Sequence, residues 1–125
     1  MDGFLSIAEV ARQTGLSAHT LRYYERAGLI ASVRRAPGGQ RRYVAADLDW
    51  IRFLLRLRDT RMPIRQMQVF ARLRSQGDST VTERRALLEQ HLVEVLASIH
   101  AMQRAAQALQ TKVDHYRGME RKVRT

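Results

Sequence analysis

The order of hydrophobic and polar residues predicts a chain of helices separated by short turns. Ser6 and Glu9 form a capping box at the start of the first helix, and Ser17 is a second N-cap. Thr80 and Glu83 form another capping box, before the longest helix. The helices expected from these signals and from apolar residues at helical spacing cover about 6–13, 17–27, 45–60, 64–75 and 80–117.

The first two helices have the pattern of a helix-turn-helix. Each is about two turns long, and they are joined by Thr14-Gly15-Leu16, in which Gly15 supplies the freedom of a tight turn. Gly28 is well placed to end the second helix. The apolar residues expected to meet between the two helices are Ile7, Val10, Ala11, Leu16, Leu21 and Tyr24.

A β-hairpin is predicted over residues 31–44. Pro37-Gly38-Gly39 is a turn signal between two short extended pieces. A hairpin that follows a helix-turn-helix is a wing, and the alternative is a loop with solvated charge. The hairpin carries four arginines, Arg34, Arg35, Arg41 and Arg42.

The longest helix carries an apolar seam with alternating spacings of four and three residues, which is the pattern of a coiled coil. A lone helix would leave this seam in water, so we expect the same helix of a second subunit to cover it. The alternative is packing on the chain's own N-terminal part, which is too short to cover an element about 55 Å long. The nine seam positions are Leu88, Leu92, Val95, Ile99, Met102, Ala106, Leu109, Val113 and Tyr116.

These elements predict a mainly α fold, in which a winged helix-turn-helix DNA-binding domain is followed by a long coiled-coil dimerisation helix. The expected parts are a DNA-binding domain at 1–75 (helix-turn-helix 6–27, wing 31–44, second helix pair 45–75), a linker at 76–79, a coiled-coil helix at 80–117 and a short tail at 118–125.

The charge supports a polyanionic partner. The 125 residues carry a net charge of +10, and 20 of the 22 basic residues are arginine. Residues 1–75 carry +8 and residues 76–125 carry +2, so the polyanion site is expected in the first part. Nucleic acid is the first candidate and an anionic membrane surface the second.

Other features of the composition narrow the class. The chain has no cysteine, which excludes a disulfide framework and a thiolate metal site. It also lacks the basic start of a signal peptide and an apolar run of roughly 20 residues, so a cytoplasmic location without a membrane span is expected. None of the four histidines pairs at i, i+4 spacing, and we expect no metal and no cofactor.

The second helix is the expected recognition helix. Arg22 can donate two hydrogen bonds to guanine or phosphate, and Tyr23 can donate to phosphate. The alternative for Arg22 is a salt bridge to Glu25 or Glu9. The DNA contacts expected from the second helix and the hairpin are Ser17, His19, Thr20, Arg22, Tyr23, Arg26, Arg34, Arg35, Arg41 and Arg42.

Four segments of the chain carry distinctive motifs, namely Leu5 to Ala11, Thr20 to Glu25, Gly28 to Ile30 and Arg41 to Tyr43. These motifs resemble the DNA-binding half of the MerR family of bacterial transcriptional regulators. The resemblance continues over nearly the whole chain, through Asp47 to Arg58, Met62-Pro63-Ile64 and the long helix. Gln40 and Arg61 depart from it, since the family often has an aromatic residue and a glycine there.

The resemblance implies a homodimer joined by an antiparallel coiled coil on a pseudo-palindromic promoter element. It also implies bending and untwisting of the promoter spacer for RNA polymerase, to activate or repress transcription. It makes Arg22 and Tyr23 recognition-helix contacts, Arg41 and Tyr43 wing contacts, and Arg61 and Arg65 part of a second wing.

The inducing signal is less defined than the DNA partner. Thiol sensing, which is typical of the family, cannot operate without cysteine. A small-molecule effector would need an apolar crevice, for which Trp50, Phe53, Met67 and Phe70 are candidates, and their alternative role is plain core.

Three other classes compete with the regulator. An architectural or excisionase-like DNA-bending protein without effector sensing can share the winged fold, but such proteins generally lack a long dimer helix. A coiled-coil protein that binds a different chain is the second. An enzyme is the weakest option, because the sequence shows no nucleophile–base set, phosphate loop or metal cluster.

Overall fold

The computed structural model describes residues 3–31 and 34–124, and most of them are helical. They divide into two units, residues 1–87 and residues 88–125. In the described parts, no helix has an apolar stretch long enough to cross a membrane. The elements are α1 (Ile7–Thr14), α2 (Ala18–Arg26), β1 (Arg34–Arg35), β2 (Arg41–Arg42), α3 (Ala45–Asp59), α4 (Ile64–Ser75), the 3₁₀ turn η1 (Gly77–Thr80) and α5 (Val81–Arg124).

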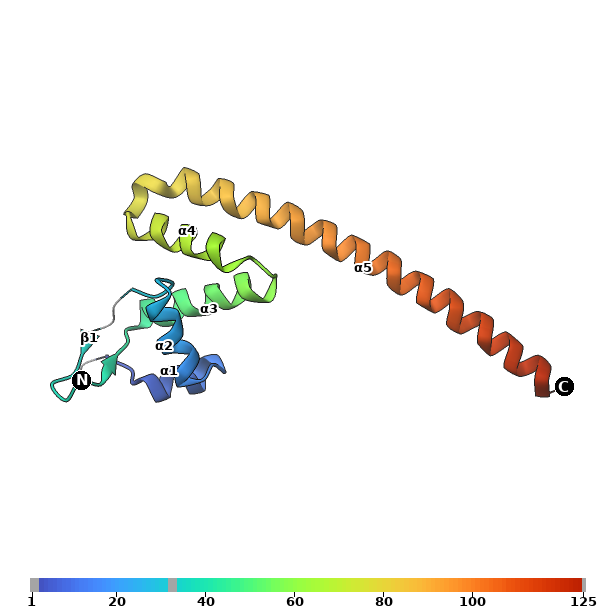
Figure 1. The fold of residues 1–125 in the computed structure, drawn as a ribbon, viewed down its shortest axis with the longest axis horizontal. Coiled ribbons are helices and arrows are strands. Elements are labelled where there is room, and N and C mark those ends of the chain that lie inside the picture. Colours follow the sequence, from blue (N-terminus) through green and yellow to red (C-terminus); the bar gives the residue numbers. More distant parts are fainter. Residues whose placement is uncertain (1–2, 32–33, 125) are drawn as a thin grey trace. The chain divides into compact units, whose positions relative to one another are not determined.

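Helices α1 and α2 form the predicted helix-turn-helix (Figure 1). The Ser6 hydroxyl accepts from the Glu9 backbone N–H at 3.1 Å, and the Ser17 hydroxyl accepts from the Thr20 N–H at 3.0 Å. Both predicted N-caps are therefore confirmed. The Glu9 carboxylate pairs with Arg12 instead of returning to the cap.

The wing is confirmed as a hairpin. Strands β1 and β2 pair antiparallel, with Arg34 opposite Arg42 and Arg35 opposite Arg41. The Ala36 carbonyl accepts from the Gly39 N–H at 2.8 Å and closes the Pro-Gly-Gly turn. The predicted hairpin positions 32–33 lie outside the described residues.

The core of the first unit lies where α1, α2, α3 and α4 meet. Helix α1 contacts α2 and α3, and α3 contacts α4. Helix α3 supplies a large share of the core, since six of its side chains are buried. The buried apolar residues are Val10, Leu16, Leu21, Tyr24, Leu29, Ile30, Tyr43, Leu48, Trp50, Ile51, Leu54, Leu55, Leu57, Met62, Met67 and Phe70.

The turn between α3 and α4 has an arginine in the left-handed region. Arg61 has φ 66°, and it is the position where the sequence lacked the expected glycine. The Arg61 N–H donates to the Arg58 carbonyl at 2.9 Å, and the Met62 N–H donates to the Leu57 carbonyl at 2.9 Å. This pair of bonds is the Schellman C-cap, so the turn keeps its geometry with arginine at the strained position.

The α4–η1–α5 corner differs from the predicted capping box. Thr80 is buried in η1, and its hydroxyl donates to the carbonyls of Leu73 at 2.5 Å and Gly77 at 3.0 Å. The Arg84 guanidinium donates to the Thr80 hydroxyl at 3.1 Å and to the Gly77 carbonyl at 3.0 Å. The hydroxyl expected to cap α5 is thus oriented back onto the end of α4.

Helix α5 is a single helix of 44 residues. It continues to Arg124, so the tail expected at 118–125 is helical as far as it is described, and Gly118 does not end the helix. Six large seam side chains of the second unit are 42–70% exposed. These are Leu92, Ile99, Met102, Leu109, Val113 and Tyr116.

Replacing the strained arginine is expected to stabilise the chain. A left-handed conformation costs a residue with a Cβ atom about 1–2 kcal/mol, and glycine removes this strain. Part of the gain is offset because glycine also makes the unfolded chain more flexible. Arg61→Gly should raise the free energy of unfolding by about 0.5–1 kcal/mol in urea titrations at fixed protein concentration. Arg61→Ala keeps the Cβ atom and is the control. Equal stabilisation by both variants would show that backbone strain is not the cause.

Candidate nucleic-acid interface

The outward face of α2 gathers the side chains predicted for recognition. His19, Tyr23 and Arg26 are exposed, and Arg22 is partly exposed. These positions follow i, i+3, i+4 and i+7 spacing, so they share one face of the helix. The opposite face holds the buried Leu21 and Tyr24, which confirms the prediction that Tyr24 is a core residue.

The two acids that could have paired with Arg22 have other partners. Glu9 pairs with Arg12 on α1, and Glu25 pairs with Arg35 at 3.7 Å. Among the residues that the structure describes, Arg22 forms no ion pair. Its guanidinium therefore has its donors available for a ligand on the outward face of α2.

Ser17 and Thr20 have local roles at the start of α2. The Ser17 hydroxyl donates to the Thr20 hydroxyl at 3.0 Å and accepts from the Thr20 backbone N–H. These bonds fix the N-terminus of the helix. The Thr20 O–H donor and the unused lone pairs of the two hydroxyls are what remains for an external ligand.

The wing is attached to the rest of the unit at several points. Leu5 and Tyr43 exchange backbone hydrogen bonds of 2.7 and 2.8 Å, which adds the N-terminal segment to the base of the hairpin. The Arg42 guanidinium lies over the Phe4 ring, 5.2 Å from its centroid. Arg35 reaches Glu25 of α2, so the hairpin is linked to the recognition helix.

Tyr43 lies in the core, although it was predicted to contact DNA. Its residue surface is 1% exposed, the lowest of the aromatic core residues. The cause is its place in the chain, because the bridge to Leu5 turns residue 43 inward just before α3 begins. A side chain buried in this way does not present its hydroxyl to an external phosphate.

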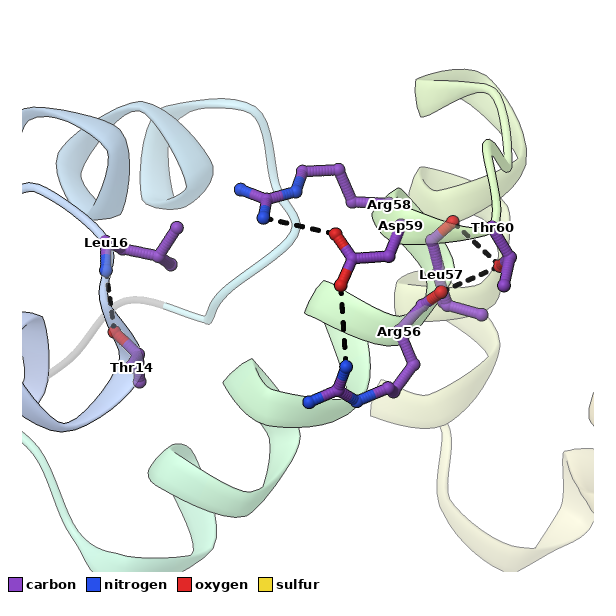
Figure 2. A network of polar contacts seen from close by, with 7 residues as sticks. All are labelled: Thr14, Leu16, Arg56, Leu57, Arg58, Asp59 and Thr60. Carbon is purple, nitrogen blue, oxygen red and sulfur yellow. Dashed lines mark hydrogen bonds and ion pairs between the residues drawn. The ribbon is translucent and has the colours of Figure 1, made fainter.

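Arg61 and Arg65 are both exposed, at the α3–α4 turn and in the first turn of α4. Nearby, Asp59 lies between two arginines at the end of α3 (Figure 2). It accepts from Arg58 at 3.2 Å and from Arg56 at 3.4 Å. The hydrogen bond to the Asp59 carboxylate raises the pKa of the Arg58 guanidinium. The acidic partner lowers the net charge of this end of α3, and Arg61 and Arg65 remain as exposed cations.

The residues predicted to line an effector crevice pack against one another. Trp50 stacks on Phe70 with centroids 5.8 Å apart, and Phe53 lies 6.0 Å from Trp50 and 5.7 Å from Phe70. Arg74 covers the Trp50 ring at 4.3 Å, and Met67 is buried. These side chains therefore pack as part of the core, which was the alternative to an effector crevice.

A shallow hollow is present on the second unit. It is lined by Tyr116, Met119, Glu120, Val123 and Arg124 along one side of α5. Met119 and Val123 are exposed apolar residues that continue beyond the predicted seam. In the described ranges, no three His, Asp or Glu side chains gather where they could hold a metal ion.

Trp50 has a role that the sequence pattern did not reveal. Its indole N–H donates to the Leu29 carbonyl at 2.8 Å, and the Gln68 amide donates to the Ala27 carbonyl at 2.9 Å. Helices α3 and α4 thereby hold the segment that ends the recognition helix. These bonds join residues 21 and 41 positions apart, so no local spacing could have indicated them.

Comparison with known proteins agrees with this arrangement. Residues 6–43 match the family described as MerR family regulatory protein. The HTH-type transcriptional regulator AdhR of Bacillus subtilis is 42% identical over 72% of this chain and 66% of its own length. An uncharacterised HTH-type transcriptional regulator of Haemophilus influenzae is 35% identical over 87% of this chain and 81% of its own length.

A solved structure extends the similarity to the fold. The crystal structure of HiNmlR, a MerR family regulator lacking the sensor domain, bound to promoter DNA, aligns with a TM-score of 0.83 at 33% identity. The alignment covers 91% of this chain and 90% of that chain. The fold and the exposed face of α2 define a winged helix-turn-helix transcriptional regulator. Within that class, the chain belongs to the MerR family.

Removing the indole donor is expected to loosen the end of the recognition helix. Trp50→Phe keeps an aromatic ring but leaves the buried Leu29 carbonyl without this donor and reduces the packed volume. We expect a loss of about 1–3 kcal/mol in the free energy of unfolding, measured by urea titration followed by circular dichroism. Phe53→Leu changes a less buried member of the same cluster and should cost less. An equal or smaller cost for Trp50→Phe would contradict the assigned role of the hydrogen bond.

Proposed function

We propose that the chain is a homodimeric, sequence-specific regulator that binds a pseudo-palindromic promoter element. The observation that carries the proposal is the outward face of α2, with Arg22, Tyr23 and Arg26 exposed or partly exposed beside a wing built from arginines. A helix-turn-helix places such a face in the major groove, where arginine reads guanine. The DNA-bound state of HiNmlR supports the same use of the fold.

The proposed contacts fall into two groups. The first group enters the major groove and consists of His19, Arg22, Tyr23 and Arg26 of the recognition helix, with Ser17 and Thr20 at the start of that helix. The second group contacts the flanking sugar-phosphate backbone, which sets register and contributes salt-dependent affinity. It consists of Arg34, Arg41 and Arg42 of the wing and Arg61 and Arg65 at the α3–α4 turn.

The apolar seam of α5 supports a second copy of the chain as the dimer partner. Six large seam side chains are at least 42% exposed in the single chain, and each would gain about 1–3 kcal/mol on burial. A two-fold axis through an antiparallel pair of α5 helices would give two recognition helices for two half-sites. The proposed domains follow from this division: a DNA-binding part before residue 76, a connection at 76–79 and a dimerisation helix from about 80.

Two recognition helices on one rigid coiled coil would deform a promoter whose half-sites do not match their separation. We propose that the dimer bends and untwists the spacer, so that RNA polymerase can engage both promoter elements. The strain in the DNA is offset by the phosphate contacts of the wings. The length of α5, 44 residues, favours this regulator over an architectural DNA-bending protein without a dimer helix.

Truncating Arg22 tests the proposed recognition. Arg22→Ala should weaken binding to the genomic site selected by the wild-type chain by about 1–3 kcal/mol, or roughly 5- to 150-fold, because a base contact is lost. Binding to random DNA of the same length should change far less in fluorescence anisotropy titrations. Arg65→Ala is the matched control and should weaken both equally. Equal loss on both DNAs for Arg22→Ala would make Arg22 a phosphate contact.

A charge in the seam tests the proposed dimer. Leu109→Glu places two carboxylates in or near the apolar interface, so the variant should sediment as a monomer at micromolar concentrations at which the wild type is a dimer. Thr111→Glu adds the same charge two residues away, on the side opposite to the seam, and should remain dimeric. A wild-type monomer, or two equally dimeric variants, would contradict the seam as the interface.

A further inference from the structure

The two strands of the wing place like charges opposite each other. Its two strands are two residues each, and both cross-strand pairs place arginine opposite arginine, at Arg34–Arg42 and Arg35–Arg41. Like charges directly opposite each other destabilise a strand pair, and an isolated two-stranded hairpin is marginal even without them. The position of the wing therefore depends on its attachments to the rest of the unit.

The base and the body of the wing are attached in different ways. At the base, Leu5 and Tyr43 exchange backbone hydrogen bonds, and Arg42 stacks on Phe4. These contacts join the hairpin to the N-terminal segment.

The ion pair between Glu25 and Arg35 connects the wing to the recognition helix. The two groups approach to 3.7 Å, and the Glu25 side chain is only 13% exposed. The Arg35 side chain is 46% exposed, so the ion pair is open to water on the arginine side. Glu25 follows Arg22 and Tyr23 on α2, and it thereby links the strand β1 to the element that presents them.

We propose that Glu25 and Arg35 are a positioning pair, which holds the wing at a set angle to the recognition helix. Arg35 then acts on DNA through the placement of the other wing arginines, and it does not neutralise a phosphate itself. This inference rests on the proposed function as a sequence-specific DNA-binding protein. It assigns a role to an acidic side chain in a surface that otherwise attracts a polyanion.

The sign of the effect separates this role from simple electrostatics. A carboxylate near DNA repels phosphate, so its removal by itself tightens binding to any DNA sequence. A positioning carboxylate has the opposite effect at the specific site, because its loss lets the wing leave the geometry that the site requires. Affinity for random DNA does not depend on the wing geometry, so it changes only with the removed charge.

The test uses Glu25→Gln, Arg35→Gln and the double variant in the full chain. Each is titrated against the genomic duplex selected by the wild type and against random DNA, at several salt concentrations. Exposed ion pairs contribute at most about 1 kcal/mol, so we expect a two- to fivefold loss at the specific site for each single variant. The loss in the double variant should be no larger than in either single variant, because the two groups act as one unit. Binding of Glu25→Gln to random DNA should be unchanged or tighter.

The salt dependence identifies which arginines meet phosphate. The slope of log affinity against log salt should stay at the wild-type value in Arg35→Gln. Arg65→Gln, which removes one of the proposed backbone contacts, is the control and should lower the slope by about 1. Thermal unfolding checks that each variant is folded, and Arg35→Gln, which is exposed, keeps the test available if Glu25→Gln is unfolded.

Two kinds of changed binding would overturn the pair. One is tighter binding of Glu25→Gln to both DNAs, and the other is a slope lowered by about 1 in Arg35→Gln with losses that add in the double variant. A wild-type chain without any preference for the selected duplex would instead overturn the proposed function. An unchanged wild-type preference together with unaffected Glu25→Gln and Arg35→Gln variants would overturn the positioning pair alone.

Discussion

The exposed apolar row along α5 is the constraint on which the rest of the account depends. Leu92, Ile99 and Leu109 would lie in water along a single helix, and burying side chains of this kind is the largest favourable term in protein association. A helix of 44 residues cannot bury one continuous row against itself. Pairing with a second α5 would bury the row and double the recognition surface, so the proposed dimer and the proposed binding to a two-fold DNA site have the same physical origin.

In the first unit, contacts with other elements hold the short helix α2 in place. Helix α2 has only nine residues, too few to be stable alone. Its caps are local, with Ser17 as the N-cap and Ala27 as the C-cap, followed by Gly28 in the left-handed region. Its end is also held by Trp50 and Gln68 from two other helices. The Glu25–Arg35 pair adds the wing to this arrangement. The polar bonds at the end of α2 and the aromatic cluster around Trp50 therefore determine where the exposed arginines lie.

Much of this fold could be predicted from local sequence, and the reason is that caps and turns are local interactions. The Ser6 and Ser17 caps and the Pro-Gly-Gly turn involve residues three or four positions apart. The predictions for Tyr43 and Thr80 differ from the structure because their contacts are not encoded in the local sequence spacing. Tyr43 is inward because of its bridge to Leu5, and the Thr80 hydroxyl bonds backwards to α4. Likewise, the ion pair of Glu25 with Arg35 joins a helix to a strand ten residues later. The sequence pattern alone therefore did not distinguish Arg35 from the other three wing arginines.

The stoichiometry and symmetry of the complex with DNA test the central claim most directly. The measurement is sedimentation equilibrium of the full chain with a genomic duplex that it selects, combined with a hydroxyl-radical footprint of the same complex. A homodimer on a two-fold site should give two chains per duplex and two protected half-sites related by a two-fold axis, with altered cleavage of the spacer between them. One chain per duplex, or a single protected segment without symmetry, would contradict it.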